Sequence, residues 1–254
     1  INLNAELSGN LGGPIQGRGV VAIPAPDKLT WIGVDWIGPL QFETNFSVID
    51  DEFSLSDSIL NTKAVRWNNV MGENLSVRFG LDKNVLRLAD AKVSVYAGKV
   101  SLNGSVDFRK GTKVDLKTVV SGVEITKLVE SSSSVVPEVA FDTLDGQFEA
   151  MGSIESGDSW YEGLSGRGTI LLQGGEMPSS SVIGSVGGAL VNLIPGFLRP
   201  GTGTLSPITQ IDHLSQAMKL EKGVLHVSDA KFVTNDYRLE GQGSIALDGA
   251  LNLH

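Results

Sequence analysis

Apolar and polar residues alternate along most of this chain with a period of two. One clear run of apolar and small positions is Val100, Leu102, Gly104, Val106 and Phe108. A second run is Leu239, Gly241, Gly243, Ile245 and Leu247. Residues two apart point to the same face of a β-strand, so each run predicts a strand with one apolar and one polar face.

The same alternation predicts further strands throughout the chain. They are expected at residues 15–23, 40–49, 53–60, 75–81, 85–96, 113–120, 140–154, 164–172, 214–220 and 224–234. Turn signals such as Lys110-Gly111 and Glu221-Lys222-Gly223 separate them. Connections this short join neighbouring antiparallel strands. We therefore expect an all-β fold with a large, curved, mainly antiparallel sheet, either an open groove or a partly closed barrel.

Two stretches of the chain repeat each other. Residues 86–106 contain Asp90-Ala91-Lys92 and then Gly104-Ser105-Val106, and residues 225–245 contain Asp229-Ala230-Lys231 and then Gly243-Ser244-Ile245. Both matches have the same offset, since 229 − 90 = 139 and 243 − 104 = 139. The pattern predicts a duplicated β-unit within a single β-rich domain that covers residues 1–254.

Two segments have helical spacing. Ile125, Leu128 and Val129 share one side of a short helix over 123–129. The strongest helix is expected at 179–194, with an apolar stripe of Val182, Val186, Leu190 and Leu193. We interpret this helix as a lid or end-cap on the apolar face. Residues 177–198 carry no charge and suit contact with a membrane surface as the alternative, although their glycines and Pro195 disfavour a membrane span.

Composition narrows the class of protein. Hydrophobic residues make up 41% of the 254 residues, which indicates a globular chain. The net charge is −9 without clustered lysine and arginine, so no nucleic-acid partner is expected. There is no cysteine, which excludes disulfides and thiolate chemistry. Both ends of the chain lie in strand pattern, so we expect a fragment of a longer protein.

No residue pattern indicates catalysis, a cofactor or a metal. His213, His226 and His254 lack the acidic spacing of a metal triad, and Asp50-Asp51 lacks an oxygen-ligand loop. The Gly-x-Gly motifs at 17–19, 166–168, 201–203 and 241–243 lack the context of a nucleotide site. Their glycines either permit close packing or leave space for a ligand on the apolar face.

Residues 218–253 carry the clearest resemblance to a known family. The order is Met218-Lys219-Leu220-Glu221-Lys222-Gly223-Val224-Leu225, then Asp229-Ala230, then Arg238-Leu239-Glu240-Gly241-Gln242-Gly243-Ser244-Ile245. Together with Tyr96-Ala97-Gly98 and Gly104-Ser105-Val106-Asp107, it resembles the AsmA-like and TamB-like envelope proteins over residues 86–254.

The resemblance implies a curved sheet whose apolar face holds acyl chains. It further implies lipid bridging between membranes or support of outer-membrane assembly, in the periplasm, with an inner-membrane anchor in a missing N-terminal segment. The implied partners are phospholipids or other acyl-chain lipids, bacterial membranes and other envelope proteins. The lipid-facing residues that we expect are Val100, Leu102, Val106, Phe108, Leu239, Ile245 and Leu247.

Two other functions remain open at this stage. One is a scaffold subunit of a secretion or assembly machine, with a β-sandwich core and no lipid. The other is carbohydrate binding on a platform of Trp31, Trp36, Trp67 and Trp160, although no paired carboxylates stand near them. The sequence does not decide whether the apolar face is an open groove or a closed core.

Overall fold

The fold is one very wide antiparallel sheet. The computed structural model describes residues 2–9, 15–24, 29–31, 34–50, 52–132, 140–154, 161–178, 208–235, 238–246 and 251–253. The strands of its first half are β1 (Asn2–Gly9), β2 (Ile15–Ile23), β3 (Leu29–Trp31), β4 (Val34–Ile49), β5 (Glu52–Trp67), β6 (Val70–Asp82), β7 (Val85–Val95) and β8 (Gly98–Asp107). Those of its second half are β9 (Thr112–Glu124), β10 (Thr143–Ile154), β11 (Leu164–Gln173), β12 (Glu176–Pro178), β13 (Ile208–Glu221), β14 (Val224–Thr234), β15 (Arg238–Ala246) and β16 (Leu251–Leu253).

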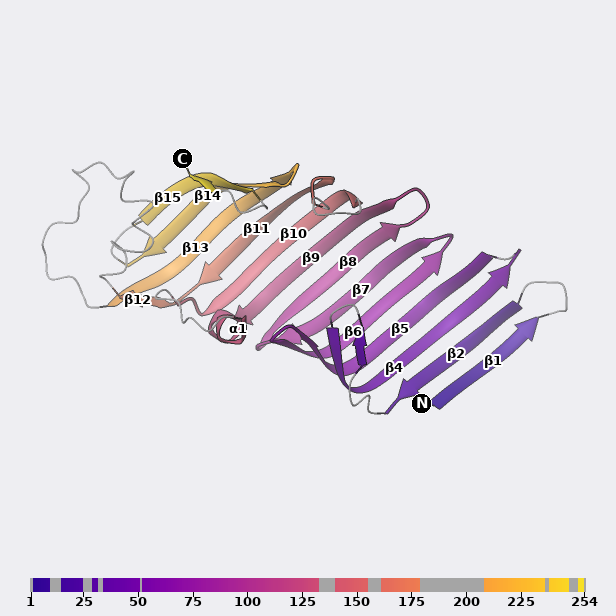
Figure 1. Cartoon of the computed structure of the whole chain (residues 1–254). Coiled ribbons are helices and arrows are strands. Elements are labelled where there is room, and N and C mark those ends of the chain that lie inside the picture. Colours follow the sequence, from indigo (N-terminus) through magenta and orange to yellow (C-terminus); the bar gives the residue numbers. More distant parts are fainter. Residues whose placement is uncertain are drawn as a thin grey trace, which may run out of the picture.

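The strands lie in the sheet in the order of the sequence, as the short turns predicted (Figure 1). The path runs from β1 to β16, with β3 paired only to β4 and β12 only to β13. In the described part of the chain the two outer strands do not pair with each other, so the sheet is open and is not a barrel. Nor do these residues form the second sheet that a β-sandwich core requires. The expected all-β, curved and mainly antiparallel sheet is confirmed.

The hairpin turns use left-handed backbone conformations. Lys83 and Asn84 have φ of 48° and 59°, and Lys222 and Gly223 have φ of 50° and 73°. Two-residue turns of this kind match the right-handed twist of the strands that they join. The second turn lies at the predicted turn signal, and the first falls between the strands expected at 75–81 and 85–96.

Several β-bulges shift the register and bend the sheet. In the hairpin of β7 and β8 the shift lies between Leu88 and Ala91, and in that of β14 and β15 it lies between Val227 and Ala230. These two positions correspond under the sequence repeat, since 227 − 88 = 139. An extra residue on one strand increases the local twist and curvature. The shared bulge is what a duplicated unit would have, and the duplication itself stays a prediction.

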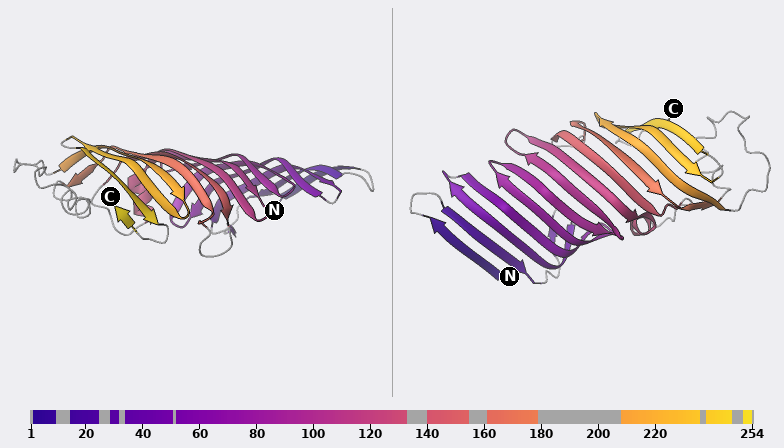
Figure 2. Two further views of the ribbon diagram at one scale, coloured as in Figure 1. Left: turned by 90° about the horizontal axis from the view of Figure 1, so that it is seen from above. Right: turned by 180° about the vertical axis from the view of Figure 1, so that it is seen from behind.

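The helix α1 (Ile125–Ser132) follows β9 at one long edge of the sheet and fulfils the helix expected near 123–129. Gly122 has φ of 62°, which lets the chain turn, and its N–H donates to Asp145 Oδ1 at 2.9 Å. The helix contacts both β6 and β9, so it lies across the ends of β7 and β8, the two strands between them. Seen from above, α1 and β3 lie on the same side of the sheet (Figure 2).

The predicted helix at 179–194, with Val182, Val186, Leu190 and Leu193, lies outside the described residues. The described part of the chain holds no helix that is long and apolar enough to span a membrane.

Candidate functional site on the apolar face

The register of the strand pairs places the apolar residues of the described strands on one face. Val114 of β9 lies opposite Val106 of β8 and Gly152 of β10, and Gly152 lies opposite Leu164 of β11. Paired residues of antiparallel strands point to the same side. Followed from pair to pair, the same side carries Leu220 of β13, and the row goes on through Leu225 and Ile245. We call this side of the sheet the apolar face.

The apolar face continues toward the N-terminal end of the chain. Leu102 lies opposite Ala91 of β7, and Ala91 lies opposite Val77 of β6. From there the pairs lead through Leu60 of β5 to Phe42 of β4 and onward to β2 and β1. The face therefore extends over the main path of the sheet from β1 to β15, leaving out β3 and β12, although the sequence resemblance had singled out only residues 86–254.

Little of this face is covered by other parts of the described chain. The buried hydrophobic side chains are Trp36, Val85, Val95, Val114, Val123, Leu164, Ile211 and Leu220. One cluster forms where Val114, Leu164 and Leu220 meet, with Val106 and Phe148 packed against it. Most other residues of the face are half-buried. Soluble monomers rarely expose apolar patches that extend this far.

Two side chains of the apolar face are buried at the edge where α1 lies. Val123 is only 2% exposed, and its backbone runs close over Gly98, where a Cβ would lie 2.4 Å from the Val123 nitrogen. Val95 is also buried there. The opposite long edge holds the cluster of Val114, Leu164 and Leu220. The face is thus most buried near its two long edges.

The expected lipid-facing residues fall on this face where the structure describes them. Val100, Leu102 and Val106 of β8 lie opposite Val120, Thr118 and Val114 of β9, and Leu239 and Ile245 of β15 lie opposite Phe232 and Leu225 of β14. Phe108 follows the last residue of β8 and is 50% exposed. Leu247 lies outside the described residues. That these side chains contact lipid stays a prediction.

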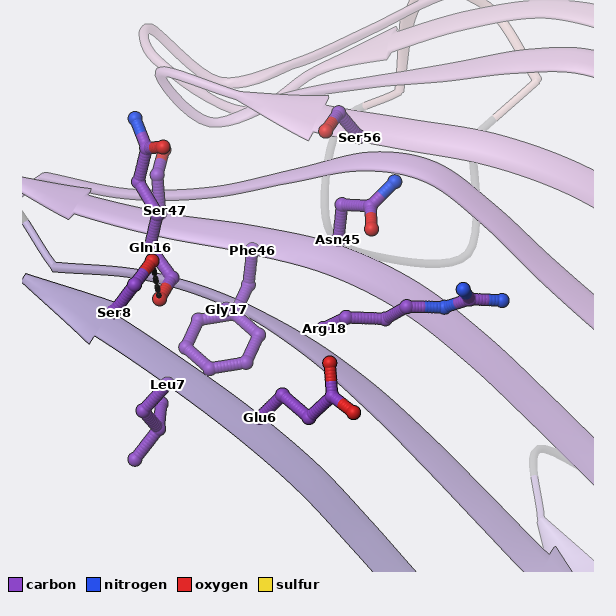
Figure 3. A pocket seen from close by; sticks show the side chains of 10 residues that line it. All are labelled: Glu6, Leu7, Ser8, Gln16, Gly17, Arg18, Asn45, Phe46, Ser47 and Ser56. Carbon is purple, nitrogen blue, oxygen red and sulfur yellow. Dashed lines mark hydrogen bonds between the residues drawn. The ribbon is translucent and has the colours of Figure 1, made fainter.

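Aromatic rings fill the space beside several glycines of the face. A Cβ on Gly168 would lie 2.6 Å from Phe148 Cδ2, and one on Gly166 would lie 3.0 Å from Phe148 Cζ. Figure 3 shows the equivalent ring of Phe46 extending from β4 to Gly17 of β2, where a Cβ would lie 2.6 Å from Phe46 Cζ. At these glycines close packing, and not a vacant ligand space, explains the missing side chain. At Gly241, in contrast, a Cβ would meet nothing within 4 Å.

Two hollows accompany these rings. One of about 250 Å³ lies on the apolar face beside Phe148 and is lined by Thr118, Val120, Leu144, Gly146, Gln147, Phe148, Thr169, Ile170 and Met218. The other, of about 570 Å³, lies over β1, β2, β4 and β5 (Figure 3). Its lining is mostly polar and comprises Glu6, Leu7, Ser8, Gln16, Gly17, Arg18, Asn45, Phe46, Ser47 and Ser56. The hollow beside Phe148 suits an apolar ligand.

The opposite face of the sheet carries ion pairs. Glu149 of β10 accepts hydrogen bonds from Lys117 Nζ of β9 at 3.0 Å and from Arg167 Nη2 of β11 at 2.9 Å. These bonds, that of Lys117 first, hold the pKa of the Glu149 carboxyl below its ordinary value. Arg18 of β2 pairs with Glu43 of β4 in the same manner. Each Gly-Arg-Gly motif in a strand thus places its glycines on the apolar face and its arginine on the polar face.

The other candidate residues do not assemble into a site. His213 Nδ1 lies 2.9 Å from Asp212 Oδ2, and His226 is exposed. His254 lies outside the described residues, among which no three histidine or acidic side chains gather as metal ligands. Trp36 is buried, Trp67 is exposed, and the side chains of Trp31 and Trp160 are not described, so the described tryptophans form no sugar-binding platform.

One family model matches this chain. The AsmA family matches residues 43–230, which run from β4 into β14 and make up most of the sequence. The match begins before the resemblance noted from residue 86 and ends before the stretch 238–247. No curated protein and no solved structure matches the chain.

Proposed function

This chain belongs to the AsmA family of the bacterial cell envelope, and we propose that its apolar face is a non-enzymatic groove for the acyl chains of lipids. In this role the protein supports phospholipid transport or outer-membrane assembly. We place it in the periplasm, anchored to the inner membrane through a segment that precedes the chain. Its partners are phospholipids, membranes and other envelope proteins.

The single observation that carries this proposal is the extent of the apolar face and the lack of a second layer over it among the described residues. An amphipathic sheet must cover its apolar side with another layer or with a ligand. Full burial of one valine or leucine side chain contributes about 1.5–3 kcal/mol, so a lipid that covers several of them gains considerable free energy.

The family also admits a role as a scaffold in envelope assembly without lipid. The polar face favours that role as a second candidate, since Glu149, Lys117 and Arg167 form an ordered network that a protein partner can bind. Such a scaffold would need no ligand on the apolar face.

Native mass spectrometry and solvent extraction of the purified protein separate these functions. We expect co-purified phospholipid or fatty acid, and saturable uptake of a fluorescent fatty acid after delipidation. Protein without extractable lipid and without uptake would leave the scaffold as the better account.

A further inference from the structure

The turn between β8 and β9 combines cations with an exposed aromatic ring. Asp107, Arg109, Lys110 and Lys113 line an open hollow of about 330 Å³ there. It lies at the long edge of the sheet opposite α1, because α1 follows the far end of β9. In a chain with a net charge of −9, three cations around one turn are a local exception.

Arg109 is held in place by Asp107. The backbone N–H of Arg109 donates to Asp107 Oδ1 at 2.9 Å, and its guanidinium Nη2 donates to Oδ2 at 2.6 Å. The side-chain bond from Arg109 is the main reason that the pKa of Asp107 falls to about 2. The Nε–H also donates to Asp107 Oδ1, at 3.0 Å. The carboxylate therefore orients the guanidinium before any ligand binds and leaves the Nη1 N–H groups for a ligand.

Lys110 and Lys113 are exposed, and neither forms an ion pair with another described residue. The N–H of Phe108 donates to the Asn84 carbonyl at 2.9 Å, which brings the turn of Lys83 and Asn84 alongside. Among the described residues that line the hollow, the three cations Arg109, Lys110 and Lys113 thus face the single carboxylate of Asp107.

The apolar face begins directly behind this turn. Val106 and Val114, which flank the turn, pack in the most buried cluster of that face. Phe108 lies in the sequence between Val106 and Arg109, and its side chain is 50% exposed. Asp107 and Lys113 are register partners on the polar face, so the cations and the apolar face meet at the edge of the sheet that the turn forms. A lipid whose acyl chains lie on the apolar face would place its phosphate at such an edge.

We propose that the β8–β9 turn binds the phosphate headgroup of an anionic phospholipid whose acyl chains lie on the apolar face. This inference rests on the proposed function. It states that the lipid headgroup lies at the β8–β9 edge of the sheet. Arg109 is the fixed donor, Lys110 and Lys113 supply mobile positive charge, and Phe108 contacts the glycerol and upper acyl region.

Vesicle co-flotation of the whole chain tests the inference. Vesicles that contain phosphatidylglycerol are compared with vesicles of pure phosphatidylcholine, for the wild type, for Lys110→Gln with Lys113→Gln, and for a control pair. The control is Lys63→Gln with Lys99→Gln, which changes the net charge equally at two exposed positions away from the turn. We expect the first pair to bind phosphatidylglycerol vesicles about tenfold more weakly and the control to bind as the wild type does.

Equal binding by all three proteins, or an equal loss in both pairs, would overturn the inference. Displacement by inorganic phosphate at matched ionic strength would show a free-anion site and also overturn it. Uptake of a fluorescent fatty acid, measured in parallel, tests the proposed function separately. If the wild type takes up the fatty acid but the two lysine substitutions do not weaken vesicle binding, only the headgroup site is overturned. If the wild type takes up no fatty acid, both the groove and this inference are overturned.

Discussion

The ring of Phe148 in β10 lies over Gly168 in the neighbouring strand β11. The two residues are register partners, and the space that a Cβ on Gly168 would take is occupied by Phe148 Cδ2 and by the Gln147 carbonyl oxygen at 2.5 Å. The ring therefore packs where the side chain of residue 168 would otherwise lie. At this position the glycine leaves room for a neighbouring aromatic ring and not for a ligand.

Gly168→Ala should destabilise the protein by about 1–3 kcal/mol, because the new methyl group meets both the ring and a backbone oxygen. Thermal or urea unfolding measures the change. Gly241→Ala is the matched control, since Gly241 lies on the same face with nothing within 4 Å. Equal stability of the two variants would contradict the packing described for Phe148.

The two faces of β8 should respond differently to charge. Val106→Asp places a carboxylate in the cluster with Val114, Leu164 and Leu220, and we expect a loss of roughly 2–4 kcal/mol in the free energy of unfolding. Ser101→Asp, opposite Lys92, should change it by less than about 0.5 kcal/mol. If urea unfolding finds both variants equally stable, the assignment of the faces is wrong.

The strained turn of β7 and β8 offers a stabilising change. Ala97 has φ of 66°, a conformation that costs a residue with a Cβ about 1–2 kcal/mol. Ala97→Gly should raise the free energy of unfolding by up to about 1 kcal/mol, after the entropy cost of glycine. Ala22→Gly, in the regular strand β2, should lower it. A melting temperature that falls in both variants would count against strain at Ala97.

The sequence predicted most strand positions, the order of strands and the short helix, because a period of two and short turns leave few other arrangements. It gave no range for the short strands β3 and β12. The turn at Tyr96 and Ala97 falls between two expected strands, although its two central residues are neither glycine nor asparagine. Tertiary contacts hold that turn, as the Tyr96 hydroxyl accepts from the Met71 N–H at 3.4 Å and its carbonyl from the Glu124 N–H at 3.0 Å.

The sequence pattern predicts the N-terminal part of the apolar face only in part. Leu40, Phe42, Thr44, Phe46 and Val48 alternate plainly. In β5, however, the bulge at Asp57, with φ of 48°, puts Leu55 and Ser58 on the same face and breaks the period. The buried hydrogen bond between Thr44 and Ser58, 2.6 Å long, places two hydroxyls where the pattern predicts apolar side chains.

The pair of Asp107 and Arg109 predicts a shifted titration. The pKa of Asp107 is lowered from 3.8 to about 2. The ionised pair therefore stabilises the folded protein at pH values above 3.8, and this stabilisation is lost as the pH falls toward 2. Arg109→Gln should move the pKa of Asp107 up toward 3.8, as measured by carboxyl NMR titration. Lys110→Gln serves as the control and should leave it near 2. An unchanged pKa in Arg109→Gln would refute the role given to that bond.

Photo-crosslinking from the two faces of β8 tests the central claim most directly. Benzoylphenylalanine replaces Leu102 on the apolar face or Asn103 on the polar face, and the protein is irradiated with phospholipid and examined by mass spectrometry. The groove predicts lipid adducts from position 102 and few or none from position 103. Adducts at equal yield from both positions, or none from position 102, would contradict it.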